Sequence, residues 1–372
     1  MTFFFPMPDL TTSSTPSTPS KTLVVGGGLA GLACAHKLHS AGVTPLLLEG
    51  SCHLGGRVAT DAVDGFLLDR GFQVFLTAYP EARKLLKLDE LQLRFFRPGA
   101  LIFRNGKCHR MMDVFRSPAH LLQTALQPIG SVSDKLRVAR LRHRLKRLKP
   151  DEIVAQKDVS TECYLREEGF TEAMIDGFFR PFYGGIFLEK DLRTSSRMFA
   201  FTFRMFAEGY AALPARGMAE IPRQLAAELA ENSIRTDAPV RSIGKGQVTL
   251  ESGERIEARH VVVATDGETA RDLVPGLGNS FVGWRSVVSL YFAAPKSPLN
   301  EAIIALNGDP EGLVNTVCVP SDVVSDYAPQ NQSLVSVSVI DLAESSNLES
   351  RVLQELESWF GPEVHAWSHL RT

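Results

Sequence analysis

A glycine-rich turn close to the start of the chain has the residue types and spacing that hold a dinucleotide phosphate. A β-prone run, Thr22 to Val25, precedes the turn, and a helical pattern follows it. The turn consists of Gly26, Gly27, Gly28, Leu29, Ala30 and Gly31. Gly26 permits the tight bend, Gly28 lets a pyrophosphate approach the backbone, and Gly31 lets the helix pack close to the sheet. The phosphates would then lie on the N-terminus of the helix, at Leu29 and Ala30.

A carboxylate follows at the distance that a ribose site requires. The helical pattern ends at Ala41-Gly42, and Val43 to Leu48 predicts a second strand that leads into Glu49. Twenty-one residues separate Gly28 from Glu49. At that spacing, an acid at the end of the second strand accepts hydrogen bonds from ribose hydroxyls. Strand, turn, helix and acid together predict a Rossmann-type dinucleotide-binding unit.

A second pair of glycines distinguishes FAD from a nicotinamide cofactor. Gly55-Gly56-Arg57 would expose backbone N–H groups to a phosphate and bring a guanidinium beside it. The stretch His53 to Thr60 resembles the R-x-G-G-R-x-x-S/T signature of a flavoprotein superfamily, which holds the flavin amine oxidases, protoporphyrinogen oxidases and phytoene or carotenoid desaturases. His53 stands where the family usually has Arg. The resemblance implies FAD as the cofactor, held by a Rossmann-type GR2 FAD-binding domain.

The resemblance extends beyond the glycine turns and implies further contacts with the cofactor. Asp69-Arg70-Gly71-Phe72-Gln73 is similar to the family's D-x-G segment, which runs past the flavin ring. Gly71, Phe72 and Gln73 are therefore expected at the cofactor. By the same resemblance, the backbone near Val240 contacts adenine, and the strand end Ala264-Thr265 lies beside the cofactor. No catalytic acid or base is nominated, and no metal site is expected.

The pattern of elements predicts an α/β fold with two discontinuous domains. We expect the FAD-binding domain over residues 21–80 and 214–278. A mixed α+β substrate-binding domain is expected over residues 81–213 and 279–372, with a helical part followed by an antiparallel sheet. The alternating stretches Ser286 to Phe292 and Ser333 to Ile340 predict strands of this sheet, which would form the floor of a cavity.

The function implied by the resemblance is that of a FAD-dependent oxidoreductase, in which hydride passes from an apolar substrate to the flavin. Nine of the 22 Phe lie between Phe170 and Phe206. So much aromatic surface beside a flavin favours a polyene, carotenoid-like or tetrapyrrole substrate, and desaturation, dehydrogenation or isomerisation as the reaction. Ordinary core packing is the other explanation of these side chains.

Two further function classes stay open. The first is a flavin amine oxidase, a class in which many members place a Lys before the first strand of the later substrate segment. The stretch Gly283 to Tyr291 contains Arg285 but no Lys, which lowers this alternative without excluding it. The second is a non-catalytic flavin-binding or membrane-surface protein, which turnover of the bound flavin would distinguish from an enzyme.

Residues 134–149 predict a basic amphipathic helix. From Ser133 to Pro150 the sequence has eight Lys or Arg and no acid after Asp134. Its apolar residues fall on one predicted face: Val138, Leu141, Leu145 and Leu148. Such a helix can lie on an anionic membrane surface, and a solvated surface helix is the alternative.

Composition limits the remaining classes. With 40 Lys and Arg against 42 Asp and Glu, the net charge of −2 provides no basic field for nucleic acid. No apolar run approaches the roughly 18 residues of a spanning helix. Five scattered Cys without a C-x-x-C pair favour a reducing intracellular compartment, with a cytoplasmic or membrane-peripheral location. The oligomeric state stays open.

The two ends of the chain carry separate expectations. Residues 1–20 should form a disordered tail, because Thr11 to Ser20 contains only Ser, Thr and Pro; a plastid transit peptide is the alternative, although the segment has no Arg. Family members close the FAD domain with a C-terminal strand ending in Gly-Asp and a Gly-rich helix. Nothing after Asp341 resembles that segment. We therefore expect a truncated chain that holds the flavin ring loosely.

Overall fold

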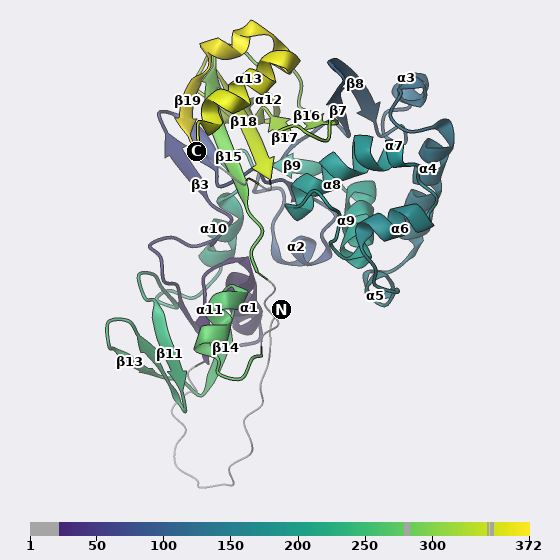
Figure 1. The fold of residues 1–372 in the computed structure, drawn as a ribbon. Coiled ribbons are helices and arrows are strands. Elements are labelled where there is room, and N and C mark those ends of the chain that lie inside the picture. The colour runs from purple at the N-terminus through teal and green to yellow at the C-terminus, as the bar shows by residue number, and fades with distance from the viewer. Residues whose placement is uncertain (1–21, 279–282, 341, 343–345) are drawn as a thin grey trace. The chain divides into compact units, whose positions relative to one another are not determined.

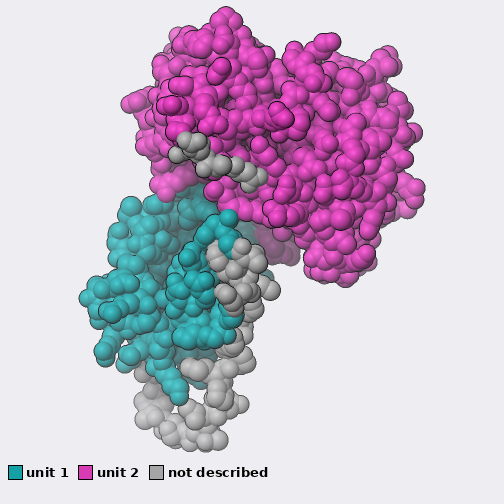
Figure 2. Space-filling model, in the orientation of Figure 1, with its two compact units in different colours: residues 1–59, 85–87, 219–284 teal, residues 60–84, 88–218, 285–372 magenta. Residues whose placement is uncertain are grey.

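The computed structural model describes residues 22–278, 283–340, 342 and 346–372. The expected tail over residues 1–20 lies outside the described residues. The chain divides into two compact units, each assembled from segments that are far apart in the sequence (Figure 2). Unit 1 holds the described chain up to Ala59, Leu85–Lys87 and Ala219–Trp284, and unit 2 holds Thr60–Lys84, Leu88–Met218 and Arg285–Thr372.

A parallel sheet with the strand order β10-β2-β1-β14 forms the centre of unit 1. Its strands are β1 (Thr22–Val25), β2 (Leu46–Leu48), β10 (Ile234–Arg235) and β14 (His260–Val263). Helix α1 (Leu29–Ser40) joins β1 to β2, and α10 (Glu220–Ala227) and α11 (Gly267–Leu273) belong to the same unit (Figure 1). Leu23, Val24 and Leu47 are fully buried, as is usual for short parallel strands.

An antiparallel insert interrupts the return of the chain to this sheet. It consists of β11 (Val240–Gly244), β12 (Gln247–Leu250) and β13 (Arg255–Glu257). Val248, Leu250 and Ile256 pack in one apolar cluster with Leu23 and Leu48, so the insert covers part of the parallel sheet.

The second strand begins later than the sequence pattern predicts, at Leu46 rather than Val43. The backbone N–H of Val43 still donates to Leu38 O at the end of α1, at 2.9 Å. Pro45 has no N–H to donate to a neighbouring strand. Both facts delay the entry of the chain into the sheet.

Unit 2 contains a long mixed sheet with the strand order β19-β15-β18-β17-β16-β7-β8. Its strands are β7 (Gly99–Arg104), β8 (Lys107–Met112), β15 (Val287–Ala294), β16 (Ile304–Asn307), β17 (Val314–Cys318), β18 (Ser333–Ile340) and β19 (Ser368–Arg371). β15 and β18 pair in antiparallel register from Val287↔Ile340 to Ala294↔Ser333. Helix α13 (Leu348–Phe360) packs on this sheet through Val352 and Leu356.

Short elements connect the sheet to the rest of unit 2. β3 (Thr60–Val63) pairs with β4 (Phe66–Asp69), and β9 (Ala211–Leu213) lies between β5 (Phe75–Leu76) and β6 (Arg94–Phe95). The remaining short helices are α2 (Pro80–Leu85), α12 (Pro320–Val323), η3 (Ser325–Tyr327) and η4 (Pro362–Ala366). Residues 60–80 and 214–218, which we expected in the FAD-binding domain, group with unit 2. The domain limits themselves stay a prediction.

The helical part of unit 2 follows β8 (Figure 1). Its elements are η1 (Pro118–His120), α3 (Leu121–Leu126), α4 (Val132–Arg147), α5 (Pro150–Val154), α6 (Thr161–Glu167), α7 (Glu172–Met174), the π-helix η2 (Ile175–Phe179), α8 (Arg180–Phe187) and α9 (Ser196–Glu208). Phe179, Tyr183 and Phe199 are at most 1% exposed and pack in one cluster. These three aromatic side chains therefore serve core packing.

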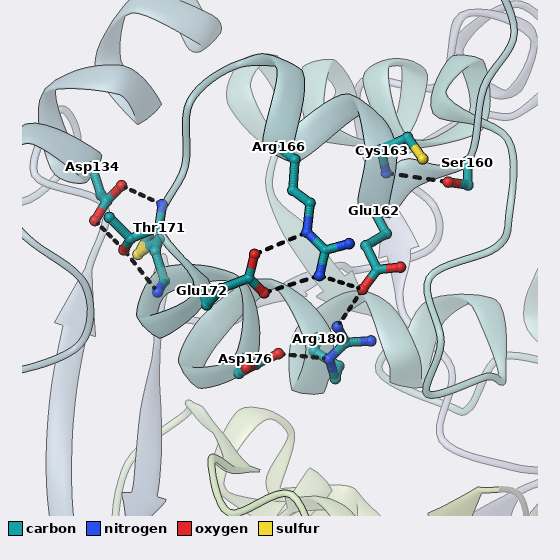
Figure 3. A network of polar contacts seen from close by, with 10 residues as sticks. Asp134, Ser160, Glu162, Cys163, Arg166, Thr171, Glu172, Asp176 and Arg180 are labelled. Atoms are coloured by element: carbon teal, nitrogen blue, oxygen red, sulfur yellow. Dashed lines mark hydrogen bonds and ion pairs between the residues drawn. The ribbon is translucent and has the colours of Figure 1, made fainter.

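A polar network connects these helices to one another (Figure 3). The carboxylate of Asp134 accepts hydrogen bonds from the backbone N–H and Oγ1 of Thr171, at 3.0 and 2.7 Å. Ion pairs link the neighbouring elements: Arg166 with Glu162 and Glu172, and Arg180 with Glu162 and Asp176. Because the partners come from α4, α6, α7, η2 and α8, the network fixes how these short elements pack.

A search of the described residues for membrane-spanning segments finds no helix with the length and apolar character to cross a bilayer.

Candidate functional site

The glycine turn between β1 and α1 has three glycines in crowded surroundings, Gly26, Gly27 and Gly31, and one in open space, Gly28. Gly26 has a φ of +106°, and a Cβ on it would lie 2.8 Å from Ala264 O. A Cβ on Gly31 would lie 1.8 Å from Gly26 O. A Cβ on Gly28 would meet nothing within 4 Å. The structure therefore leaves open space in front of Gly28, where the sequence predicted the approach of a pyrophosphate.

The N-terminus of α1 opens beside this space. Gly28 is the N-cap, it supplies no side-chain cap, and its carbonyl accepts the N–H of Leu32 at 2.9 Å. The N–H groups of the first helical turn, which include those of Leu29 and Ala30, have no partner within the helix. Together with the helix dipole they form a site suited to an anion.

The second glycine turn lies directly against the first. Gly55 N donates to Gly27 O at 2.8 Å, and Gly28 and Gly55 form a parallel bridge. Gly55 and Gly56 both have positive φ, at +106° and +59°, and a Cβ on Gly55 would lie 2.3 Å from Val58 O. The two turns, separated by more than twenty residues in the sequence, are thus brought together, with the exposed Arg57 next to them.

Glu49 is held in place at the carboxyl end of β2. Its Oε2 accepts the N–H of Gly27 at 2.6 Å, and its Oε1 accepts the N–H and Oγ of Ser51 at 2.9 and 2.8 Å. Each carboxylate oxygen has two lone pairs, so Oε1 is fully occupied and Oε2 keeps one acceptor position for a ribose hydroxyl. The acid therefore braces the glycine turn and retains one acceptor position beside it.

The remaining predicted residues of unit 1 lie on the same edge of the sheet. Ala238 N donates to Glu49 O at 2.9 Å, which brings the start of β11, and with it Val240, to the end of β2. Ala264 N donates to Val25 O at 2.8 Å. Ala264 and Thr265 thereby lie against the turn at Gly26. The structure thus brings together all the predicted site residues of unit 1, and the predicted cofactor contacts stay a prediction.

In unit 2, the D-x-G segment begins with a buried carboxyl group. Asp69 is 7% exposed. Its Oδ1 accepts Thr60 Oγ1 at 2.5 Å and Met218 N at 2.9 Å, and its Oδ2 accepts the hydroxyl of Tyr327 at 2.8 Å. Burial raises the pKa of Asp69 above its usual value, although these three hydrogen bonds oppose the shift. The segment is thus anchored by a buried carboxyl group that accepts three hydrogen bonds.

Two tyrosines enclose Asp69. The Tyr291 hydroxyl donates to the backbone O of Asp69. Burial, together with the charge of Asp69, raises the pKa of Tyr291 to about 12. The same causes raise the pKa of Tyr327. Sequence analysis nominated neither tyrosine, because Tyr291 lies in a predicted strand and Tyr327 is 258 positions away from Asp69.

A narrow recess lies beside this group within unit 2. Gly71, Phe72 and Gln73 line it, as do Leu67, Asp69, Leu213, Tyr291, Pro320, Tyr327, Leu334 and Ser336. Ser336 is 2% exposed, and its hydroxyl makes no hydrogen bond of regular geometry within the described part of the chain. The recess thus combines apolar walls with uncharged hydroxyl and amide groups, and it contains the three residues that the D-x-G resemblance implied.

Comparisons with known proteins identify the group to which these features belong. The family model described as flavin containing amine oxidoreductase matches residues 29–371. Coproporphyrinogen III oxidase of Propionibacterium freudenreichii subsp. freudenreichii is 30% identical over 171 residues, which are 44% of this chain and 31% of that protein. The 15-cis-phytoene desaturase of Arabidopsis thaliana is 42% identical over 71 residues, 19% of this chain and 12% of that protein. The chain thus matches less than a third of the length of these curated relatives.

Solved structures confirm the predicted fold class. An oxidoreductase from Methanosarcina mazei superposes with a TM-score of 0.71 at 17% identity, covering 94% of this chain and 86% of that one. A putrescine oxidase redesigned in its cofactor binding gives a TM-score of 0.69 at 18% identity, covering 94% and 84% of the two chains. The fold is therefore the mixed α/β fold of the flavin amine oxidases, with a Rossmann-like parallel sheet and a mixed second sheet.

Proposed function

Since the chain belongs to the flavin-containing amine oxidoreductase family, whose cofactor is FAD, we propose that it is an oxidoreductase acting on an apolar polyene-like or tetrapyrrole substrate. Two relatives support this substrate class, because one is named a coproporphyrinogen oxidase and the other a phytoene desaturase. FAD supplies the hydride acceptor. The chain's own residues bind and orient both molecules and keep water away.

The cofactor is held, in this proposal, by the two glycine turns and Glu49. The open space at Gly28 and the uncapped start of α1 suit the pyrophosphate. The guanidinium of Arg57 adds a charge-assisted contact to the same phosphates. Glu49 accepts from the ribose, and the backbone near Val240 contacts adenine. Ala264 and Thr265 border the same edge of unit 1.

The observation that carries the substrate class is the mostly apolar lining of the recess in unit 2, in which Asp69 is the one acidic residue. Its lining includes no Lys, Arg or His, so the carboxylate of an amino acid would find no cationic partner there. The one acid, Asp69, is only 7% exposed. An ammonium group would have to give up its hydration to reach this buried carboxyl group, and that cost offsets much of the attraction. A neutral, apolar substrate carries no charge that would need a partner in such a site.

Many flavin amine oxidases have a Lys in the segment that contains Arg285, and in this chain the guanidinium of Arg285 is already engaged by other side chains. Its Nη1 lies 3.0 Å from Glu189 Oε1 and donates to Thr194 Oγ1 at 2.6 Å. These contacts engage the guanidinium within unit 2. The alternative consequently rests on the family resemblance and on the L-amino-acid oxidase of Crotalus adamanteus, 32% identical over 41% of this chain and 31% of that protein.

The proposal is tested by anaerobic reduction of the bound flavin. The FAD-loaded chain is mixed with a porphyrinogen, a linear polyene, a primary amine and an L-amino acid, and the oxidised flavin band is followed over time. We expect the band to disappear with the porphyrinogen or the polyene. Reduction by the amine or the amino acid alone would transfer the assignment to the amine oxidases. Reduction by none of the four, with a chemically reducible flavin, would indicate a non-catalytic flavin-binding protein.

A further inference from the structure

Large apolar side chains are exposed in one short stretch of unit 2. Between residues 115 and 136 their exposed fractions are 53% for Phe115, 58% for Leu121, 71% for Leu122, 74% for Leu126, 62% for Val132 and 67% for Leu136. Single exposed apolar residues are ordinary, but a contiguous group of them marks an interaction site. We call these six residues, with the outward basic residues of α4 described below, the α3–α4 surface.

Helix α3 is anchored in a way that turns its leucines outward. Thr124 is buried and its Oγ1 accepts the N–H of Met112 in β8, at 3.3 Å. Leu121, Leu122 and Leu126 have no such inward position and remain exposed. The fold thus fixes α3 against the sheet by a polar contact and leaves its apolar side chains uncovered.

The first turn of α4 is attached to the end of α3. Lys135 Nζ donates to Ala125 O at 2.9 Å and to Gln127 O at 2.7 Å. This lysine bridges the two helices, so the exposed Leu126 of α3 and the exposed Val132 and Leu136 of α4 belong to one region. Figure 1 shows α3 and α4 together at the margin of the helical part.

The two faces of α4 have different roles. The four apolar residues of the predicted face belong to the core: Leu141 and Leu145 are buried, and Val138 and Leu148 pack against them. The residues on the opposite side of the helix recur at helical spacing and are all exposed: Val132, Leu136, Arg140, His143 and Arg147. This side changes from apolar to basic along the helix.

Charge decides which partner fits this surface. Within the described chain, Arg140, His143 and Arg147 take part in no ion pair, and the sequence has no acid between Lys135 and Pro150. Arg144 differs, because it donates to Glu168 and Tyr164. Exposed leucines beside unpaired arginines are the pattern of an interfacial helix, whose apolar side enters the acyl boundary while cations meet anionic headgroups.

We propose that the α3–α4 surface docks this protein on an anionic lipid bilayer. Leu121, Leu122 and Leu126 enter the interface, and Arg140 and Arg147 contact the headgroups. The inference is independent of the proposed function, since it rests on exposure and charge in the helical part alone. It predicts binding that weakens as salt rises, because exposed charges are screened within about 10 Å at 0.1 M salt.

The test is sedimentation of the FAD-loaded chain with vesicles of phosphatidylcholine alone or mixed with phosphatidylserine. We expect sedimentation only with the mixed vesicles. Each basic residue near an anionic surface contributes about 1 kcal/mol, or about fivefold in affinity, so R140E with R147E should weaken binding by about 25-fold or more. L122S with L126S should abolish it. The matched controls are V154S, at an exposed apolar residue of α5, and K157E, at an exposed lysine outside the surface; both should bind like the wild type.

Three results would overturn the proposal. The first is a wild-type chain that stays in the supernatant with mixed vesicles at low salt. The second is loss of binding in V154S equal to that in the leucine variant. The third is a wild-type dimer that the leucine variant converts to a monomer with no change in vesicle binding, which would identify the surface as a contact between two copies. Thermal unfolding of every variant confirms that the helical part remains folded.

Discussion

At the scale of single residues, the glycines of the dinucleotide motif separate into structural and ligand-facing positions. A Cβ on Gly31 would overlap Gly26 O, whereas a Cβ on Gly28 would point into open space. The sequence motif names both glycines without distinguishing them. The structure does so because it shows which neighbour each missing side chain would meet.

This distinction predicts opposite behaviour for two alanine substitutions. Gly31→Ala should destabilise unit 1 even without cofactor, because its Cβ would lie 1.8 Å from a backbone oxygen. Gly28→Ala should leave the unfolding temperature of the apo chain unchanged and weaken FAD binding about tenfold or more, or about 1.4 kcal/mol. Thermal unfolding of the apo chain and a FAD titration measure the two effects. Gly28→Ala that binds FAD like the wild type would disprove the assignment of this space to the pyrophosphate.

The hydroxyl of Tyr327 has a clear energetic role. It donates to the buried carboxyl group of Asp69, so Tyr327→Phe should leave an acceptor unsatisfied and cost about 1–3 kcal/mol of unfolding free energy. Tyr183 is the matched control, because its buried hydroxyl makes no regular hydrogen bond among the described residues. Tyr183→Phe should cost less than 1 kcal/mol. Urea unfolding of the two variants tests the comparison, and equal losses would show that the Asp69 contact adds nothing.

At the scale of elements, α4 shows what sequence periodicity can predict and what it cannot. The pattern predicts an amphipathic helix over 134–149, and the structure has one over Val132–Arg147. The apolar face that the pattern identifies packs in the core of unit 2. Periodicity identifies an apolar face, but whether protein or lipid covers it depends on residues such as Phe170 and Phe199 that are distant in the sequence.

The start of α4 provides a pH-dependent stabilisation (Figure 3). Burial alone would raise the pKa of Asp134, but hydrogen bonds from Thr171 and Ser131 lower it to about 2, below the ordinary 3.8. A carboxylate with a lowered folded-state pKa stabilises the fold above its unfolded pKa, and that stabilisation is lost as the pH falls toward 2. The shift corresponds to about 2 kcal/mol.

Asp134→Asn should therefore destabilise the chain by about 2 kcal/mol or more at neutral pH, with a difference from the wild type that narrows below about pH 4. Urea unfolding across this range measures the difference. Asp176→Asn is the control, because Asp176 is half-exposed and pairs only with Arg180 in Figure 3; it should change stability by less than 1 kcal/mol at any pH. If the difference in unfolding free energy between wild type and Asp134→Asn stayed constant across this pH range, the lowered pKa of Asp134 would not be a source of stability.

At the scale of the whole molecule, prediction succeeds where the signal is local. The strand, glycine turn and acid from Thr22 to Glu49 are contiguous, so spacing alone predicts the parallel strands β1 and β2 and the helix that joins them. The same sequence gives no hint that Tyr327 encloses Asp69, since that contact depends on how β15 and η3, which lies between β17 and β18, fold back on β4. When site residues come from segments that are far apart in the sequence, residue spacing does not identify them.

The central claim is that unit 1 binds FAD through the two glycine turns and Glu49. The most direct measurement is a calorimetric titration of the apo chain with FAD, repeated with ADP present and with Glu49→Gln, which keeps the size of the side chain while removing its charge. The account predicts one FAD per chain, competition by ADP, and binding at least tenfold weaker in Glu49→Gln, since a hydrogen bond to a charged group contributes about 1.5–3 kcal/mol. Absence of FAD binding, or equal affinity in wild type and Glu49→Gln without competition by ADP, would contradict it.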